Sequence, residues 1–220
     1  MQVLVTGGLG YIGSHTSVLL LEKGYDLVIV DDLSNSNEKV IENISQITSK
    51  VPVFEKIDLK DKESVSKLFN NYDFDGIIHF AAHKSVNESV NYPDKYFKNN
   101  VGSLENIIYE IQKLKKPMNF IFSSSCTVYG QADSMPINEG FELKKAESPY
   151  GQSKRKCEEI LENFHKTGHN FKNITLRYFN PIGAHPTSLI GELPIGIPEN
   201  LVPYITQTAV GKRDQLTVFG

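Results

Sequence analysis

The stretch Gln2-Val3-Leu4-Val5-Thr6-Gly7-Gly8-Leu9-Gly10-Tyr11-Ile12-Gly13 carries the strongest indication of the fold. A short apolar run leads directly into Gly7, Gly10 and Gly13, which recur at every third position before a predicted helix over residues 11–22. Glycines in this arrangement let the backbone turn tightly and approach a diphosphate, which then lies on the positive N-terminal end of the helix. The glycine pattern alone is weak, but a strand before it and a helix after it are the context that the motif requires. The stretch therefore predicts a dinucleotide site at the first strand–helix junction.

Short β-branched runs alternate with longer amphipathic runs along most of the chain. Near-continuous apolar strands that alternate with helices predict a parallel sheet covered on both faces, and right-handed crossovers then give a doubly wound α/β fold of the Rossmann type. The predicted strands are residues 2–6, 26–30, 53–57, 76–81, 119–124 and 174–178, and the predicted helices are 11–22, 38–48, 62–70, 93–114 and 150–166.

The character of the sequence changes after residue 179. Residues 180–200 are rich in proline and glycine and follow neither periodicity, which is more typical of a binding loop than of a linker. A short helix (202–210) and a strand (216–219) are predicted beyond it. One helix and one strand cannot close a second core. We therefore expect a dinucleotide-binding domain at 1–179, followed at 180–220 by the beginning of a smaller substrate domain that this chain does not complete.

Acidic and small side chains follow the predicted strands at one edge of the sheet. Asp31-Asp32 ends the second strand, at the spacing where a carboxylate binds the adenosine ribose hydroxyls of a dinucleotide. A carboxylate there repels the additional phosphate of NADP and no arginine is near, so NAD is predicted, although a solvated acidic pair is the simpler alternative. The ends of the third and fourth strands add Asp58, Leu59, Phe80, Ala81 and Ala82.

Tyr150 and Lys154 are four residues apart at the start of a predicted helix, so they lie one turn apart on one face. A tyrosine with a pKa near 10 is a poor base at neutral pH. A neighbouring ammonium and a positively charged nicotinamide both favour its phenolate. Isolated pairs of this kind arise by chance, but Ser123-Ser124-Ser125 ends the fifth strand, where a hydroxyl can share the substrate proton. Ser125 is the preferred partner and Ser124 the alternative.

Several stretches together resemble the UDP-glucose 4-epimerase family of the extended short-chain dehydrogenases/reductases. The general features are the glycine pattern and Tyr150-Gly151-Gln152-Ser153-Lys154. The narrower ones are Ser123-Ser124-Ser125-Cys126-Thr127-Val128-Tyr129-Gly130, Leu176-Arg177-Tyr178-Phe179-Asn180-Pro181-Ile182-Gly183-Ala184-His185-Pro186, and Leu216-Thr217-Val218-Phe219-Gly220.

The resemblance implies an NAD-dependent, reversible epimerisation at C4 of UDP-glucose and UDP-galactose through a 4-keto sugar. It makes Tyr150 the acid/base, Ser125 its hydroxyl partner and Lys154 the cation that lowers its pKa. A homodimer is implied, paired through the helices near 93–114 and 150–166. The implied cofactor contacts are Gly7, Gly10, Tyr11, Ile12, Gly13, Asp31, Asn35, Ser36, Asp58, Leu59, Phe80, Ala81, Ala82, Lys84, Asn100, Ser123, Tyr150, Lys154 and Tyr178; the implied substrate contacts are Ser125, Tyr150, Asn180, Asn200, Leu201, Thr217 and Phe219.

Composition and the remaining motifs argue against other classes of protein. The net charge of −3 and the lack of a basic stripe speak against nucleic acid as a partner, and no apolar run reaches the roughly 20 residues of a membrane helix. Two cysteines and no leader sequence favour the cytoplasm. The pair His79 and His83 has no further ligands, so no metal is expected. The alternatives are a related dehydratase or decarboxylase, disfavoured by Cys126-Thr127 where dehydratases carry Asp-Glu, and a non-catalytic NAD-binding fragment.

Overall fold

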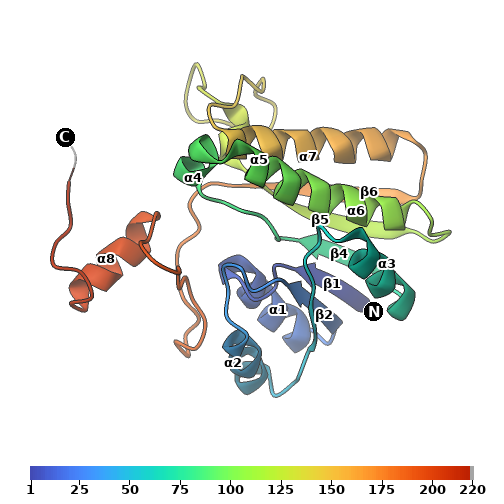
Figure 1. The fold of residues 1–220 in the computed structure, drawn as a ribbon, viewed down its shortest axis with the longest axis horizontal. Coiled ribbons are helices and arrows are strands. Elements are labelled where there is room, and N and C mark those ends of the chain that lie inside the picture. Colours follow the sequence, from blue (N-terminus) through green and yellow to red (C-terminus); the bar gives the residue numbers. More distant parts are fainter. Residues whose placement is uncertain (219–220) are drawn as a thin grey trace.

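Six parallel strands form a single sheet in the computed structural model, which describes residues 1–218 (Figure 1). The strand order is β3-β2-β1-β4-β5-β6, so the chain moves outward from β1 and then crosses back beside it to continue with β4. The predicted doubly wound parallel sheet is confirmed. The strands are β1 (Gln2–Thr6), β2 (Asp26–Asp31), β3 (Val53–Lys56), β4 (Gly76–His79), β5 (Met118–Ser125) and β6 (Phe171–Tyr178).

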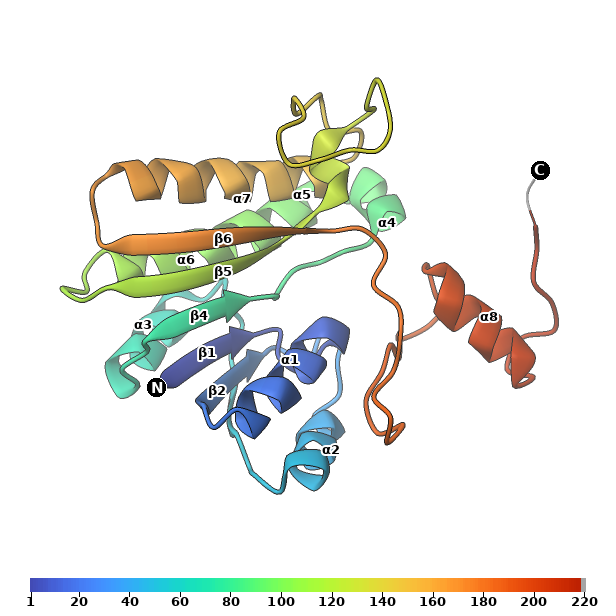
Figure 2. The ribbon, with the colours of Figure 1, turned by 180° about the vertical axis from the view of Figure 1, so that it is seen from behind.

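Helices cover both faces of the sheet, as Figures 1 and 2 show from opposite sides. On one face lie α1 (Tyr11–Glu22) and α2 (Lys39–Thr48), and on the other lie α3 (Lys62–Asn71), α6 (Gly102–Ile111) and α7 (Pro149–Lys166). Within the described part of the chain, no helix combines the length and apolar character needed to cross a membrane.

The alternation of side chains along each strand produces two separate cores. In β1, Leu4 points into the cluster beneath α3, α6 and α7, while Val3 and Val5 point into the cluster beneath α1 and α2. Both faces of the central strands are therefore apolar, which explains the near-continuous hydrophobic runs in the sequence. β1 and β4 pair directly in the middle of the sheet, and the strand order reverses at that point.

The structure differs from the sequence-based expectation in four places. The predicted helix 93–114 is interrupted: α5 (Pro93–Tyr96) runs into a π-helical turn, η1 (Phe97–Val101), before α6 begins. A short helix that was not predicted, α4 (Val86–Asn91), precedes it, and a 3₁₀ turn, η2 (Cys126–Tyr129), follows β5. The predicted strand at 216–219 is wrong for residues 216–218, which have no regular structure; Phe219 lies outside the described residues.

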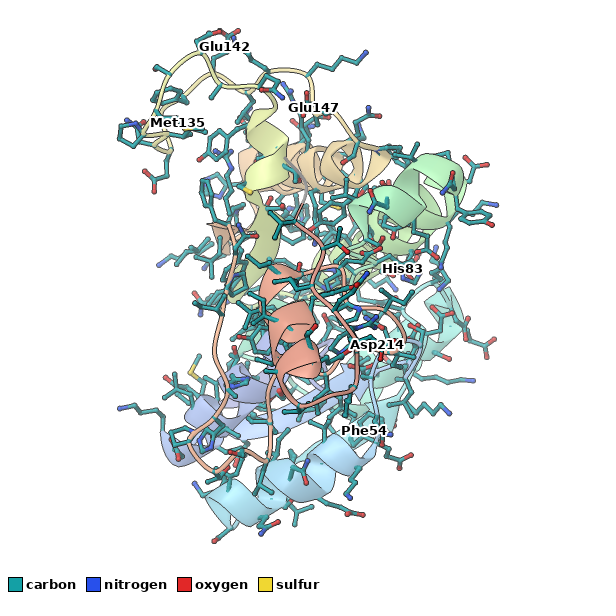
Figure 3. The ribbon with its side chains drawn as sticks, turned by 90° about the vertical axis from the view of Figure 1, so that its left-hand side faces the viewer. Phe54, His83, Met135, Glu142, Glu147 and Asp214 are labelled. Carbon is teal, nitrogen blue, oxygen red and sulfur yellow. The ribbon has the colours of Figure 1, made fainter. Side chains whose placement is uncertain are left out.

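The segment after β6 leaves the sheet and runs across its edge. A long irregular loop leads to α8 (Leu201–Ala209), which stands apart from the layered body in Figures 1 and 2. The connection between η2 and α7 also projects from the body, with Met135 and Glu142 in its outer part (Figure 3). The division into two domains at residue 179 stays a prediction.

Candidate active site

The glycine turn after β1 brings two parts of the backbone into close contact. Gly7 has φ +64°, and a Cβ atom there would lie 2.7 Å from the backbone nitrogen of Ala81, at the end of β4. A side chain on Gly13 would overlap the carbonyl oxygen of Gly7. The first turn of α1 can therefore pack against the loop only because both positions lack a side chain, which leaves its N-terminal amide groups at the cavity edge.

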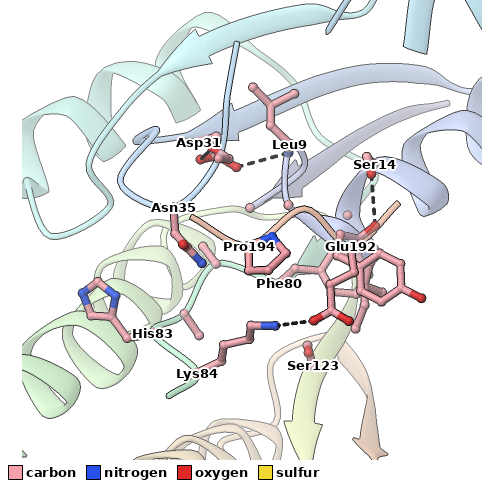
Figure 4. Close-up of a pocket in the computed structure, with 18 of the residues that line it drawn as sticks. Leu9, Ser14, Asp31, Asn35, Phe80, His83, Lys84, Ser123, Glu192 and Pro194 are labelled. Carbon is pink, nitrogen blue, oxygen red and sulfur yellow. Dashed lines mark hydrogen bonds and ion pairs between the residues drawn. The ribbon is translucent and has the colours of Figure 1, made fainter. Parts of the chain in front are cut away.

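Asp31 fixes the geometry of the next strand end. Its carboxylate accepts hydrogen bonds from Leu9 N at 3.1 Å, Leu33 N at 3.1 Å and Ser36 Oγ at 2.7 Å. The side chain thus joins the glycine turn to the loop after β2, as the dashed line from Asp31 to Leu9 shows in Figure 4. This places a buried carboxylate at the cavity wall.

A cavity of about 840 Å³ opens along the carboxyl ends of the strands, where the strand order reverses. This edge is where doubly wound folds bind their ligands, and the volume is within the range of small-molecule sites. Most of the predicted site residues line the cavity: Gly7, Gly10, Tyr11, Ile12, Gly13, Asp31, Asn35, Ser36, Asp58, Leu59, Phe80, Ala81, Ala82, Lys84, Ser123, Ser125, Tyr150, Lys154, Tyr178, Asn180, Asn200 and Leu201.

Tyr150 lies in the first turn of α7, where Ser148 caps the helix by accepting a hydrogen bond from Gly151 N. Burial raises the pKa of Tyr150, and a hydrogen bond with the Ser125 side chain acts in the opposite direction. Burial is the larger of the two effects, since Tyr150 is only 9% exposed. The lowering of this pKa by Lys154 and a bound nicotinamide together stays a prediction.

Lys154 lies one helical turn further along α7, with its ammonium buried beneath the cavity floor. Its Nζ donates to the carbonyl oxygen of Ser123 at 2.7 Å, and burial lowers its pKa to about 8. The ammonium is thus held at the end of β5 and still carries its charge near neutral pH.

The two candidate serines have different partners. Ser124 Oγ donates to the Glu158 carboxylate at 2.5 Å, so its hydroxyl is directed at α7. Ser125 Oγ accepts from Thr127 N at 3.2 Å, caps η2 and lines the cavity together with Tyr150. This arrangement favours Ser125 over Ser124 as the partner of Tyr150.

A family model described as GDP-mannose 4,6 dehydratase matches residues 4–220. The chain belongs to this family. It is 48% identical over 222 residues to the UDP-glucose 4-epimerase of Schizosaccharomyces pombe, covering 99% of this chain and 62% of that protein. It is 47% identical over 220 residues to the UDP-glucose 4-epimerase of Bacillus subtilis, covering 100% of this chain and 64% of that protein.

Solved structures of UDP-glucose 4-epimerases superpose closely on this chain. The UDP-glucose 4-epimerase of Stenotrophomonas maltophila, with bound NAD and formylated UDP-arabinopyranose, superposes with a TM-score of 0.95 at 44% identity. That of Bifidobacterium longum, in complex with NAD+ and UDP, gives 0.96 at 41% identity. Both comparisons cover 100% of this chain and 65% of the other. The predicted relationship to UDP-glucose 4-epimerases is confirmed, and the chain spans a little under two thirds of the length of these relatives.

Two predicted contacts of this family member lie away from the cavity lining. Asn100, in η1, is buried and bonded on all sides: its Nδ2 donates to Ser153 Oγ at 3.0 Å and to His83 O at 3.1 Å, and its Oδ1 accepts from His83 N at 2.8 Å. Asn99 lines the cavity instead. Thr217 lies outside the described lining, and Phe219 lies outside the described residues.

The loop after β6, for which the sequence predicts a binding loop, forms part of the cavity wall. Lys84 Nζ and Glu192 Oε1 form an ion pair of 3.1 Å, visible in Figure 4, and Asn200 donates to the same carboxylate. Tyr11 Oη also donates to Gly183 O at 2.7 Å. Glu192 had no local sequence signal, because its partner Lys84 is 108 positions away in the chain.

His79 and His83, which have the spacing of a metal-binding pair in the sequence, lie in different environments. His79 is buried beside Phe122, with Nδ1 at 2.7 Å from Thr6 Oγ1, and burial lowers its pKa to about 3. His83 lies beyond the end of β4 and packs its ring on Tyr96. Among residues 1–218, no group of three or more potential metal ligands converges.

We expect Lys154→Met to stabilise the folded chain at pH 7 by about 2 kcal/mol, because it removes a buried charge at the loss of one hydrogen bond. The pKa of Lys154 falls from 10.5 to about 8 on folding, so between these values the unfolded chain holds the extra proton and wild-type stability rises with pH. The advantage of the variant should therefore shrink as the pH rises from 8 to 10.5. Urea unfolding at several pH values measures this difference in the free energy of unfolding. Lys156→Met, on the exposed side of α7, is the control, and equal stability of Lys154→Met and wild type at pH 7 contradicts the expectation.

Proposed function

We propose that the chain binds NAD and interconverts UDP-glucose and UDP-galactose by epimerisation at C4. The observation that carries the proposal is the cluster of Ser125, Tyr150 and Lys154 at one end of a cavity whose other end is the glycine turn. An acid/base tyrosine and a dinucleotide cradle thus share one space. The relatives, which are UDP-glucose 4-epimerases, supply the choice of substrate.

The residues present fit NAD. Gly7 and Gly13 leave room for a diphosphate where side chains would close the turn, and the N-terminus of α1 is directed at that space. Asp31 supplies a carboxylate for ribose hydroxyls at the end of β2. Asp58, Leu59, Phe80, Ala81 and Ala82 line the same cavity, which supports our assignment of the first two to the adenine and of the last three to the part of the cofactor beside the end of β4.

Tyr150 Oη is the group that moves the proton. NAD, when bound, supplies a reversible acceptor for the C4 hydride of the sugar. Tyr150 would take the proton of the 4-hydroxyl as C4 is oxidised to a ketone. The 4-keto sugar would then turn in the cavity, so that C4 is reduced from its opposite face while Tyr150 returns the proton, and the net reaction is an isomerisation. Ser125 orients the 4-hydroxyl. The Lys154 ammonium stabilises the Tyr150 phenolate and also binds the hydroxyls of the nicotinamide ribose. Because the protein alone raises the pKa of Tyr150, the base is formed only when a further positive charge lies beside it.

The residues after β5 favour epimerisation over dehydration. A dehydratase needs a carboxylic acid and a carboxylate beside the sugar to expel water from C5 and C6. Cys126 and Thr127 occupy the positions where such relatives carry that pair, and both line the cavity. Burial raises the pKa of Cys126, so the thiol is not a replacement base. We place Asn180, Asn200 and Leu201 around the sugar and phosphates, and Thr217 and Phe219 beside the uracil.

We expect the chain to bind NAD about 100-fold more tightly than NADP, because the second phosphate would meet the Asp31 carboxylate. Asp31→Asn keeps the shape of the side chain and removes the charge, so it should reduce the discrimination by about tenfold. Asp26→Asn, at the exposed start of the same strand, is the matched control. Isothermal titration calorimetry measures both affinities; equal wild-type affinities for NAD and NADP contradict the assignment.

The function is tested by incubating the chain with NAD and UDP-galactose and measuring UDP-glucose with a coupled dehydrogenase. Conversion that depends on the chain supports the proposal. A 4-keto-6-deoxy product would show a dehydratase instead. NAD binding without any conversion would make the chain a non-catalytic NAD-binding protein.

The proposal extends to assembly and location. A homodimer paired through the helices near 93–114 and 150–166 is supported by the partly exposed rings of Phe97 and Tyr109 on the first of these. Sedimentation velocity tests it, and a monomer at micromolar concentration would refute it. A cytoplasmic location is supported by Cys126 and Cys157, which are both free thiols.

A further inference from the structure

Three consecutive serines of β5 lie beside three successive turns of α7. Tyr150, Lys154 and Glu158 follow one another at intervals of four residues, so they lie on one face of the helix. Ser125 and Tyr150 line the same cavity, the carbonyl of Ser123 accepts from Lys154, and the hydroxyl of Ser124 donates to Glu158. The first two pairs belong to the proposed reaction. The third involves a residue to which the proposed mechanism gives no part.

Glu158 is a nearly buried carboxylate with every partner defined. Its side chain is 11% exposed, and Oε1 accepts from Ser124 Oγ at 2.5 Å and from Arg177 Nε at 3.0 Å. Oε2 accepts from Arg177 Nη2 at 2.8 Å, so the guanidinium of β6 holds the carboxylate with two parallel bonds. The guanidinium also lies 4.7 Å from the ring centre of Tyr129, at the end of η2. One carboxylate therefore ties α7, β5, β6 and the turn after Ser125 together.

We propose that Glu158 is a positioning residue that holds the Ser124–Ser125 turn in register with Tyr150 and Lys154. The proposal rests on the proposed function for the importance of that register. Its physical basis is that charge-assisted hydrogen bonds in a nearly buried site fix geometry more firmly than neutral ones. Removing Glu158 leaves Ser124 without its acceptor and Arg177 without its counter-ion, so the turn that carries Ser125 loses its anchor.

Glu158 also contributes to the charge state of Lys154. The charged or titratable groups that face the ammonium are His79 of β4, kept neutral by burial, and Cys157 and Glu158 of α7. The last two raise the pKa of Lys154 against the effect of burial. The same carboxylate thus supports both neighbours of Tyr150.

The first test compares Glu158→Gln with Glu159→Gln, which removes an exposed carboxylate from the adjacent position of the same helix. We expect Glu158→Gln to lower kcat for UDP-galactose by about 100-fold, as misplacement of a reacting group does. The KM for UDP-galactose and the Kd for NAD should stay within about twofold of wild type. Unchanged kcat overturns the proposal. So does a loss of NAD affinity parallel to the loss of kcat, because that indicates general damage to the fold.

The second test does not depend on turnover, so it separates failure of this proposal from failure of the proposed function. Cys126 follows Ser125 directly and is partly exposed, whereas Cys157 is buried. Loosening the turn should speed alkylation of Cys126 by iodoacetamide by about tenfold in Glu158→Gln, and leave it unchanged in Glu159→Gln. Ser124→Ala, which keeps the ion pair with Arg177, should also speed it. If Cys126 reacts at the wild-type rate in both Glu158→Gln and Ser124→Ala, the proposal is overturned, even for a chain without epimerase activity.

Discussion

Tyr150→Phe is expected to lower the turnover of UDP-galactose by about 1000-fold, because the change removes the hydroxyl that the proposed mechanism uses to exchange a proton with the sugar. The phenyl ring preserves the edge-on contact with Tyr96 at a centroid distance of 6.4 Å. NAD affinity should therefore remain at the wild-type value. Initial rates in the coupled assay and calorimetric titration with NAD measure the two effects separately.

The control for this variant is Tyr204→Phe, on α8, whose ring contacts Arg213. It removes a hydroxyl of the same kind from a tyrosine that does not line the cavity, so both turnover and NAD affinity should stay unchanged. If Tyr150→Phe turned over UDP-galactose at a rate near that of wild type, Tyr150 could not be the acid/base.

Gly7→Ala should weaken NAD binding by about 100-fold. The new methyl group meets the backbone nitrogen of Ala81 at 2.7 Å, and this contact cannot be relieved by rotation of a side chain. Pushing the glycine turn away from the end of β4 is comparable to overpacking a core, which costs roughly 1–3 kcal/mol. The proposed diphosphate site includes this turn, so the change should appear in the NAD affinity measured by calorimetry.

Gly24→Ala separates the steric effect from backbone strain. Gly24 also has a positive φ, +86°, but among the described residues no atom lies within 4 Å of the added carbon. Both variants should lower the unfolding temperature, because alanine disfavours positive φ. Only Gly7→Ala should lose NAD affinity. A folded Gly7→Ala chain that binds NAD as tightly as Gly24→Ala would remove the glycine turn from the binding site.

Features that depend on local sequence could be predicted well. The central strands β1, β2 and β4 coincide with apolar runs that the sheet buries, and the spacing of Tyr150 and Lys154 placed both on one face of α7. The glycine turn was recognisable because the motif and its structural context occupy a dozen consecutive residues. In each case one element fixes the relative positions of the residues concerned.

Features that depend on contacts between residues far apart in the sequence could not be predicted. The π-helical turn η1 has no sequence pattern of its own, and it turns Asn100 toward His83 and Ser153. The rise in the pKa of Tyr150 on burial could not be predicted either, because spacing reveals a neighbouring charge but not the extent of burial. Likewise, the strand expected at 216–218 needs a partner strand, which the described residues do not provide.

The most direct test of the proposed function follows the hydrogen at C4. The chain is incubated with NAD and UDP-galactose carrying deuterium at C4, and the products are examined by NMR and mass spectrometry. The account predicts UDP-glucose that retains the deuterium at C4, because the hydride is taken from that carbon and returned to it within one site. UDP-glucose with hydrogen from solvent at C4, a 4-keto-6-deoxy sugar, or unchanged UDP-galactose would contradict it.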